Sequence, residues 1–288
     1  MSASVINTNI ASINAQRSLS KTGSALQQAM ERLSSGLRVN SAKDDAAGLA
    51  IADRMTSQIR GMTVATRNAN DGISMAQTAE SAMGQLTDLF QRMRDLAVQA
   101  RNTAAVSSDD RAKLNTEFSQ LGLEVSRIID NTKYNGKQLL KGSLDGANFQ
   151  VGWSTAADNQ ISVTVSNLAS VSGVTSLLGT GKSIAFAGLS NGAVESGIAS
   201  VIQAIDVAVG KVDTFRSKLG AVQSRFTMTI TNLESAIEAQ SAARSRILDA
   251  DFAAETANLA KSQVLQQAGT AMLAQANQLP SQVLTLLK

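Results

Sequence analysis

The feature that most constrains the fold is an apolar stripe that runs from Gly48 to Ala100. Alternate steps of three and four residues meet an apolar or small residue at every position of this stripe except Gln58. This heptad spacing is typical of a helix that packs against another helix. A helix of this length extends roughly 80 Å at ~1.5 Å per residue, which no compact globule needs. We therefore predict a rod of paired helices.

A second stripe of the same kind runs from Ile198 to Ile237, and only Arg216 and Gln223 interrupt it. It predicts a second long helix, of roughly 60 Å by the same rise per residue, that lies along the first. The two polar side chains either reach past the apolar seam or hydrogen-bond across the helix pair. A polar contact that sets the register of the pair is the sharper alternative.

Three shorter amphipathic segments accompany the long helices. One is predicted to begin at Ser108 or Asp109, whose side chains can cap a helix. The other two lie near the chain ends and are expected to pair with each other, leaving apolar surface for partner chains, because neither has much core of its own. The three stripes are Leu114, Phe118, Leu121, Val125 and Ile128; Leu26, Met30, Leu33 and Leu37; and Leu265, Ala268, Met272, Ala276 and Leu279.

Residues 143–196 differ in composition, since they hold only four charged residues and are rich in Ser, Thr, Gly and Val. Residues 149–153 and 161–165 alternate in polarity on either side of a polar turn, which predicts a β-hairpin. The rest of the segment is predicted to be loop or short strand. Composition leaves open whether its hydroxyl side chains carry O-linked sugars.

These patterns predict a mainly α fold. It is a long antiparallel helical coiled-coil bundle with paired N- and C-terminal helices and a small segment, containing a β-hairpin, at the distal end. The predicted parts are a terminal helix pair (residues 1–43 and 245–288), a rod of long helices (44–142 and 197–244) and an exposed β/loop segment (143–196).

Composition excludes most catalytic chemistry. The chain has no Cys and no His, which removes thiol nucleophiles, Ser–His pairs and Cys/His zinc sites. The net charge of +3 is small for 288 residues, and the basic residues lack aromatic partners, so nucleic acid is not an expected partner. No run approaches the ~20 apolar residues of a membrane span, and residues 1–17 do not resemble a cleaved signal peptide. We expect no catalytic residue, metal site, cofactor or membrane partner.

The stretch RLSSGLRVNSAKDDAAGLAIADRM, residues 32–55, holds a serine pair and a lysine beside two aspartates, a cluster that could suggest a reaction centre. Ser41 and Asp44 have the spacing of a capping box. Asp44 and Asp45 are predicted to lie in the first turn of the long helix, where the helix dipole favours acids. Adjacent helical side chains point apart, so these two carboxylates cannot share a proton. The stretch is therefore predicted to connect the terminal helix to the long helix.

Several segments form a specific combination. They are VINTNIASINAQRSL, ERLSSGLRVNSAKDDAAGLAIADRM, RNANDGISMAQTAE and QRMRDLAVQA in the first half, and GAVQSRFTMTITNL, ARSRILDADFAAETANLAKSQVLQQAGTAMLAQANQ and VLTLLK in the second. Through them the chain resembles bacterial flagellins, in a short form, over about residues 2–140 and 209–288. Residues 143–196 leave no room for the large outer domains that many flagellins carry.

The resemblance implies a structural subunit of the flagellar filament, a helical tubular polymer that acts as the propeller for swimming. The implied location is extracellular, reached through the flagellar type III apparatus without a cleaved signal peptide. The implied partners are copies of the same chain, an export chaperone, and the filament cap and hook-junction proteins. The resemblance also implies subunit contacts at the connector, through Arg38, Asn40, Ser41, Lys43, Asp44 and Asp45.

Recognition of the monomer by animal hosts is a further implication of the resemblance. Arg92, Leu96 and, on the neighbouring helix, Glu117 match contact positions of the flagellin-sensing Toll-like receptor, on a surface that the polymer would bury. The C-terminal helix matches the part that the export chaperone binds and the leucine-rich end sensed by cytosolic inflammasome receptors, and it is expected to pack in the inner tube. Its contact residues are Leu279, Val283, Leu284, Leu286 and Leu287.

Three alternatives compete with a filament subunit. A hook–filament junction protein shares the paired terminal helices, although its terminal motifs are typically weaker matches than these. A flagellin with a metallopeptidase domain needs an HExxH helix, which a chain without His cannot form. Without the resemblance, the heptad pattern alone supports a generic coiled-coil scaffold.

Overall fold

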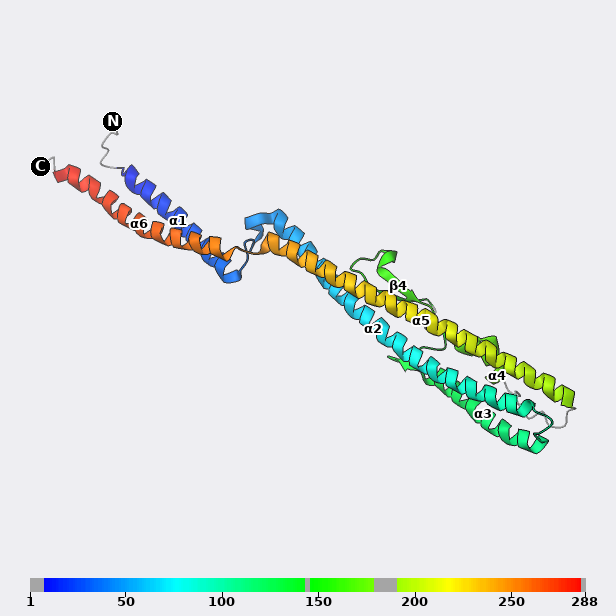
Figure 1. Cartoon of the computed structure of the whole chain (residues 1–288). Coiled ribbons are helices and arrows are strands. Elements are labelled where there is room, and N and C mark those ends of the chain that lie inside the picture. Colours follow the sequence, from blue (N-terminus) through cyan, green and yellow to red (C-terminus); the bar gives the residue numbers. More distant parts are fainter. Residues whose placement is uncertain (1–7, 143–145, 179–190, 286–288) are drawn as a thin grey trace. The chain divides into compact units, whose positions relative to one another are not determined.

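The computed structural model describes residues 8–142, 146–178 and 191–285, without the side chains of residues 178, 191 and 279–285. The chain is mainly helical, with small β-hairpins, as predicted (Figure 1). Its elements in chain order are α1 (Ile10–Ser35), α2 (Ala42–Arg101), α3 (Ser108–Asn131), β1 (Lys133–Tyr134), β2 (Lys137–Gln138), β3 (Ala147–Gln150), η1 (Ala157–Asn159), β4 (Gln160–Val163), η2 (Leu168–Ser170), α4 (Ser172–Leu178), α5 (Asn191–Leu248) and α6 (Phe252–Thr285).

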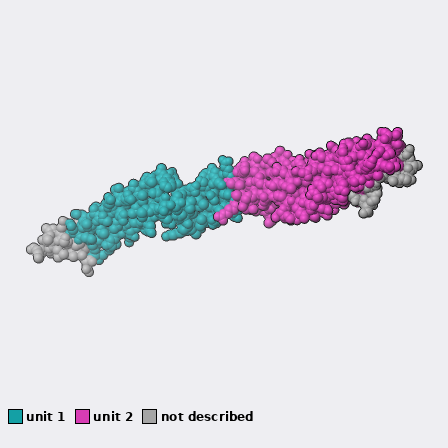
Figure 2. Space-filling view, turned by 90° about the horizontal axis from the view of Figure 1, so that it is seen from below, with its two compact units in different colours: residues 1–59, 238–288 teal, residues 60–237 magenta. Residues whose placement is uncertain are grey.

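The chain divides into two compact units, which Figure 2 shows in different colours. Unit 1 comprises residues 1–59 and 238–288, and unit 2 comprises residues 60–237. The predicted pairings of α1 with α6 and of α2 with α5 are confirmed. Helices α2 and α5 each contribute residues to both units.

The core of unit 2 follows the heptad stripe of α2. From Met62 to Ala100, every position of that stripe is buried. On α5 the buried residues recur at the same spacing, for example Ile205, Val212 and Leu219. The two helices are antiparallel, as two contacts show. The Arg94 Nε atom of α2 donates to Asp206 Oδ1 of α5 at 2.8 Å. Glu80, which comes earlier on α2, is bonded to Gln223, which comes later on α5.

The two polar residues in the α5 stripe behave differently. The Gln223 Nε2 atom donates to Glu80 Oε2 of α2 at 2.9 Å. Arg216 pairs only loosely with Asp213 of its own helix, at 4.0 Å. Of these two residues, Gln223 therefore makes a polar contact across the helix pair, whereas Arg216 makes none with the described residues of α2.

A capping side chain explains where α3 begins. Its N-cap is Ser107, one residue before the predicted start, and the Ser107 Oγ atom accepts from Asp110 N at 3.1 Å and donates to Asp110 Oδ2 at 2.8 Å. The hydrogen bond from Ser107 is the main cause that lowers the pKa of Asp110, followed by Lys113. After α3, β1 and β2 form a short hairpin around Asn135 and Gly136, both with positive φ, as a type I′ turn requires.

The predicted β-hairpin is present as β3 and β4, with Phe149 opposite Ile161. Its position differs from the predicted distal end, because it packs along the helix pair. The Asn68 Nδ2 atom of α2 donates to Gln150 O at 3.0 Å, and the Phe149 ring meets the Phe226 ring of α5 edge-on at 5.5 Å. The apolar face of the hairpin needs an apolar surface to cover it, and the α2–α5 seam provides one.

The rest of this segment is more helical than predicted. Residues 172–178 form the helix α4 rather than loop or strand, and α5 begins at Asn191 rather than near residue 197. Gly173 of α4 lies against the backbone of α5, since a Cβ at Gly173 would be 2.4 Å from Ala204 O. Docking on α5 therefore stabilises a short helix that the Ser/Gly-rich sequence alone does not indicate.

Helix α5 is, by length and composition alone, apolar enough to cross a membrane. Its most apolar window has a mean hydropathy of 1.4, and 28% of that window is buried. This share is close to the two positions in seven that a coiled coil buries. Heptad packing of α5 thus accounts for the buried share of this stretch.

Candidate assembly and recognition sites

The connector between α1 and α2 contains two helix starts. Asp45 has non-helical backbone angles (φ −161°, ψ 97°) within α2, and its Oδ1 atom accepts from Gly48 N at 2.8 Å. Asp45 thus acts as the N-cap of the long helix beyond the kink, rather than as a residue of its first turn. A Cβ at Gly48 would lie 2.3 Å from Asp45 Oδ2. Gly48 therefore makes room for the capping carboxylate.

Asp44 stabilises the short turn before that kink. Its Oδ2 atom accepts from Ser41 N and Ser41 Oγ, both at 2.9 Å, and from Asn40 N at 3.2 Å. These bonds, with that from the Ser41 side chain largest, hold the pKa of Asp44 below its usual value, because they stabilise the charged form. Lys43 is exposed and forms no ion pair with the described part of the chain. The described residues include no cluster of acids that could hold a metal ion.

The two connectors of unit 1 bond to each other. The Arg38 N atom donates to Leu248 O at 2.6 Å, and Ala250 N donates to Gly36 O at 2.9 Å. The Arg38 Nη2 atom also donates to Ile247 O at 2.8 Å, where the last turn of α5 leaves carbonyl groups without helical partners. The backbone N–H and C=O groups of the two connectors thus hydrogen-bond to the other connector instead of to water.

The seam between α1 and α6 is built largely from small and polar residues. Its buried residues are Ser12, Ala29, Glu255, Ser262 and Ala276. A Cβ at Gly269 would lie 3.1 Å from Leu19 Cδ1, so the helices approach closely there. Because small side chains bury little apolar area, this seam contributes far less stabilisation than the core of unit 2.

A polar clasp fixes the register of α1 against α6. The Asn9 Nδ2 atom donates to Ala276 O at 2.7 Å, and the Ser12 Oγ atom donates to Asn277 Oδ1 at 2.8 Å. The Asn9 Oδ1 atom also accepts from Ser12 N and caps α1. An apolar stripe cannot indicate these residues, because their side chains are polar.

The large apolar side chains of the α1–α6 pair lie mostly on its surface. The predicted stripe of α6 is exposed at Leu265 and Met272, and only Ala276 of its described members is buried. The exposed large apolar residues of the pair are Ile10 (63%), Ile13 (47%), Met30 (49%), Phe252 (57%), Val264 (64%), Leu265 (48%) and Met272 (65%). These exposed apolar side chains are candidates for contacts with other chains.

The structure brings Arg92, Leu96 and Glu117 together but does not expose all three. The Arg92 Nε and Nη2 atoms donate to Glu117 Oε1 at 2.9 and 2.7 Å, which links α2 to α3. Both of these side chains are about half exposed, whereas Leu96 is only 2% exposed. Leu96 therefore belongs to the core of unit 2. Of the C-terminal contact residues, the side chains of Leu279, Val283, Leu284, Leu286 and Leu287 lie outside the described residues.

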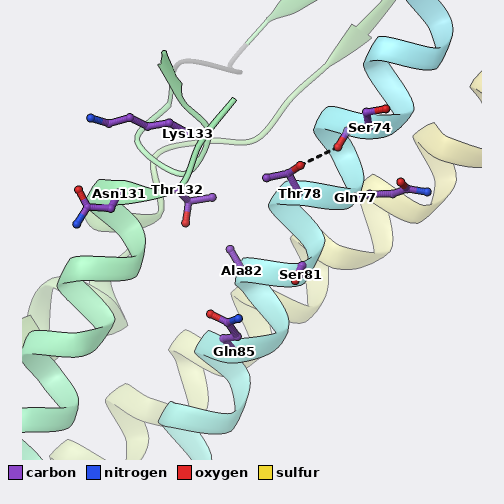
Figure 3. A pocket seen from close by; sticks show the side chains of 9 residues that line it. All are labelled: Ser74, Gln77, Thr78, Ser81, Ala82, Gln85, Asn131, Thr132 and Lys133. Carbon is purple, nitrogen blue, oxygen red and sulfur yellow. Dashed lines mark hydrogen bonds between the residues drawn. The ribbon is translucent and has the colours of Figure 1, made fainter. Parts of the chain in front are cut away.

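A hollow of about 720 Å³ lies between α2 and the end of α3 (Figure 3). Its lining is polar, and Lys133 is the one charged side chain among the residues that Figure 3 labels. The hydroxyl groups of Thr78 and Thr132 donate to carbonyl groups of their own helices. These two hydroxyl groups are therefore already hydrogen-bonded within their own helices.

Comparison with known proteins adds to this geometry. Two family models match the chain: the bacterial flagellin N-terminal helical region over residues 6–145, and the C-terminal helical region over residues 202–287. A flagellin of Halalkalibacterium halodurans is 42% identical over 284 residues, which are 99% of this chain and 100% of the relative. A flagellin of Bacillus subtilis is 41% identical over 304 residues, covering 98% and 99% of the two chains. The crystal structure of a Bacillus cereus flagellin is 24% identical and covers 58% of this chain and 88% of its own, with a TM-score of 0.46.

Proposed function

The chain belongs to the bacterial flagellin family, whose members are structural subunits of the flagellar filament, and we propose how its parts share that task. It is a non-enzymatic protein whose copies polymerise into an extracellular filament. The terminal helix pair (residues 1–43 and 245–288) forms the inner tube, and the long helices (44–142 and 197–244) form the outer tube. Residues 143–196 face the solvent.

The observation that carries this proposal is the exposed apolar surface of the α1–α6 pair. Burial of one large apolar side chain contributes about 1.5–3 kcal/mol. Residues such as Val264, Leu265 and Met272 gain little of this in a single chain, since each is about half or more exposed. Contacts with neighbouring copies bury them, so assembly completes the packing of unit 1.

The contacts between copies are heterologous, which means that two different surfaces meet. Heterologous contacts that do not close into a ring generate an open helical filament. The antiparallel α1–α6 pair presents different residues at its two ends, the Asn9 clasp at one and the Arg38 crossing at the other. Such a pair suits head-to-tail stacking.

Seeded polymerisation tests the proposal. Purified monomer is added to short filament fragments, and elongation is followed by light scattering and electron microscopy. The variant Leu265→Lys/Met272→Lys is expected to stop elongation, because it places two charges on the surface that assembly buries. The matched control Val207→Lys/Met228→Lys also adds two charges, at exposed residues of unit 2 (40% and 73%), and is expected to elongate. Equal loss in both variants contradicts the role given to unit 1.

We also propose that the free monomer is recognised by the flagellin-sensing Toll-like receptor through Arg92 and Glu117. Their exposed ion pair supports this, while buried Leu96 acts by holding α2 in place. Arg92→Ala and Glu117→Ala are expected to reduce receptor signalling with less than about 1 kcal/mol of lost stability, because exposed ion pairs contribute little. Leu96→Ala costs about 2–5 kcal/mol, so its loss of signalling is expected to accompany loss of fold. Full signalling by both surface variants contradicts the proposal.

The remaining partners of the filament subunit are proposed on the family alone. They are an export chaperone and inflammasome receptors at the C-terminal helix, and the filament cap and hook-junction proteins at the filament ends. Export is proposed to follow the flagellar type III route. A chain shortened after residue 278 is expected to lose co-purification with the chaperone. Mass spectrometry of residues 143–196 from native filaments shows whether they carry O-linked sugars.

A further inference from the structure

A cleft of about 360 Å³ lies on the α1–α6 pair, and its charge is unbalanced. Its lining includes Lys21, Arg32 and Lys261 against one acid, Glu255. The Arg32 Nη1 atom lies 3.9 Å from Glu255 Oε2, and the Arg32 Nε atom is buried without an acceptor in the described structure. Lys21 and Lys261 form no ion pair with any described residue. The cleft therefore holds two unpaired ammonium groups and an unsatisfied guanidinium donor.

Charge is also distributed unevenly along the same helix pair. Residues 8–30 and 256–285 contain Arg17, Lys21 and Lys261 and no acidic residue. The connector end of the pair, in contrast, carries three exposed carboxylates that form no ion pair within the described part of the chain: Glu31, Asp249 and Asp251. Away from the connector the pair is thus purely basic, whereas the connector end carries carboxylates without ion pairs next to basic residues such as Arg32 and Arg38.

We propose that this basic cleft receives the connector carboxylates of a second copy of the same chain. The inference deepens the proposed function and rests on it, since only a polymer supplies the second copy. Two copies aligned without an offset would place cations beside cations, which costs free energy at an interface. An axial offset instead places Glu31, Asp249 and Asp251 beside the cleft, where charge-assisted hydrogen bonds form.

The spacing of the charges sets the size of this offset. At ~1.5 Å per helical residue, Lys21 and Glu31 are separated by about 15 Å along α1. The carboxylates of Asp249 and Asp251, beside the end of α1, extend this distance to about 20 Å. Neighbouring terminal helix pairs that face each other across the cleft are therefore expected to be offset by about 15–20 Å in a map of the filament.

Charge reversal and mixing test the pairing. A cleft-reversed variant (Lys21→Glu/Lys261→Glu) and an acid-reversed variant (Glu31→Lys/Asp249→Lys) are each expected to elongate filaments about tenfold or more slowly than the parent at 0.15 M salt. Asp251 is left unchanged because it caps α6, its Oδ1 atom accepting from Ala253 N. An equal mixture of the two variants is expected to recover elongation to within about threefold of the parent. In the mixture each reversed cleft meets a reversed acidic end of the other variant.

Controls separate this pairing from other causes. Lys133→Glu/Lys211→Glu changes two exposed lysines of unit 2 by the same charge and is expected to elongate like the parent. The defects of the reversed variants are expected to shrink in 1 M salt, where the Debye length falls to about 3 Å. Circular dichroism checks that each variant folds. If a reversed variant does not fold, Lys21→Gln/Lys261→Gln replaces it, with a smaller expected loss and no recovery on mixing.

Parental elongation by the cleft-reversed variant, or no recovery on mixing of folded variants, overturns the pairing. Binding of the parental cleft to another acidic protein while the mixture fails to recover overturns it as well. A parent chain that does not elongate on seeds contradicts the filament function itself, so the two failures are distinguishable.

Discussion

Gly72 of α2 faces the ring of Phe226 on α5. A Cβ at Gly72 would lie 2.7 Å from Phe226 Cζ and 2.9 Å from Cε2, so Gly72→Ala forces the ring to move. The ring is fully buried and meets Phe149 edge-on, so it has little space in which to move. Overpacking of this kind costs about 1–3 kcal/mol, while alanine is the better helix former by about 0.8–1 kcal/mol. Gly72→Ala is therefore expected to lower the free energy of unfolding by about 1 kcal/mol.

The same substitution is expected to have the opposite sign once the ring is removed. Phe226→Ala alone costs about 3–5 kcal/mol, because it leaves a cavity in the core. In that background the new methyl group of Gly72→Ala meets no ring, and its helix propensity dominates. The alanine is then expected to stabilise unit 2 by up to about 1 kcal/mol. The coupling energy of this double-mutant cycle is thus expected to be about 1–3 kcal/mol.

Urea unfolding of the monomer, followed by tryptophan fluorescence, measures this cycle. Trp153 is the only tryptophan of the chain and lies in unit 2, so the signal reports that unit. Gly84→Ala is the control, because Gly84 is on the same helix and a Cβ there meets nothing within 4 Å. It is expected to stabilise both backgrounds by about 1 kcal/mol. Equal effects of Gly72→Ala with and without the Phe226 ring would refute the packing argument.

Further predictions concern the connector and the helix seam. The pKa of Asp44 is lowered on folding, so its contribution to stability is complete above its unfolded pKa of about 3.9 and is lost as the pH falls through the lower folded value; the stability difference between the parent and Asp44→Asn, measured against pH, should decline there. Gln223→Ala should cost about 1.5–3 kcal/mol in urea unfolding, because Glu80 loses a hydrogen bond to a charged group, while Glu80→Gln keeps the contact and should cost less. Gly48→Ala should displace the Asp45 cap at a cost of about 0.5–2 kcal/mol, offset by helix propensity, so stability changes little while hydrogen exchange at residue 48 speeds up.

The sequence predicted the α2–α5 pair well because a repeated pattern is robust to single exceptions. From Met62 onward every predicted stripe position is buried. Earlier in the same stripe the agreement ends, since Ile51 is 38% exposed and Ala52 is fully buried in its place. A heptad pattern indicates that the apolar face of a helix packs against another surface. It does not indicate whether that surface belongs to the same chain or to another copy.

The hairpin shows a second limit of sequence patterns. Alternation of apolar residues predicted its strands, but its place along the rod depends on two contacts that no local pattern contains. One is the close approach of the loop to α2, where a Cβ at Gly61 would lie 2.8 Å from Trp153 Cβ. The other is the ring pair of Phe149 and Phe226. Both join residues far apart in the chain, so they follow from tertiary packing alone.

In the terminal helices, many residues of the predicted apolar stripes are exposed instead of forming the core of the single chain. Their apolar stripes were expected to mark an amphipathic face. In the single chain the described stripe of α6 is exposed except at Ala276, and the stripe of α1 is half-buried except at exposed Met30. The polar residues Ser12, Glu255 and Ser262 are buried in the seam. A seam of small and polar residues holds the pair by geometry and hydrogen bonds, which leaves the larger apolar side chains free. Burial of these side chains then contributes its free energy when copies meet, rather than when one chain folds. We therefore propose that the exposed stripe of α6 is core of the polymer, and substitutions there should affect assembly far more than the stability of the monomer.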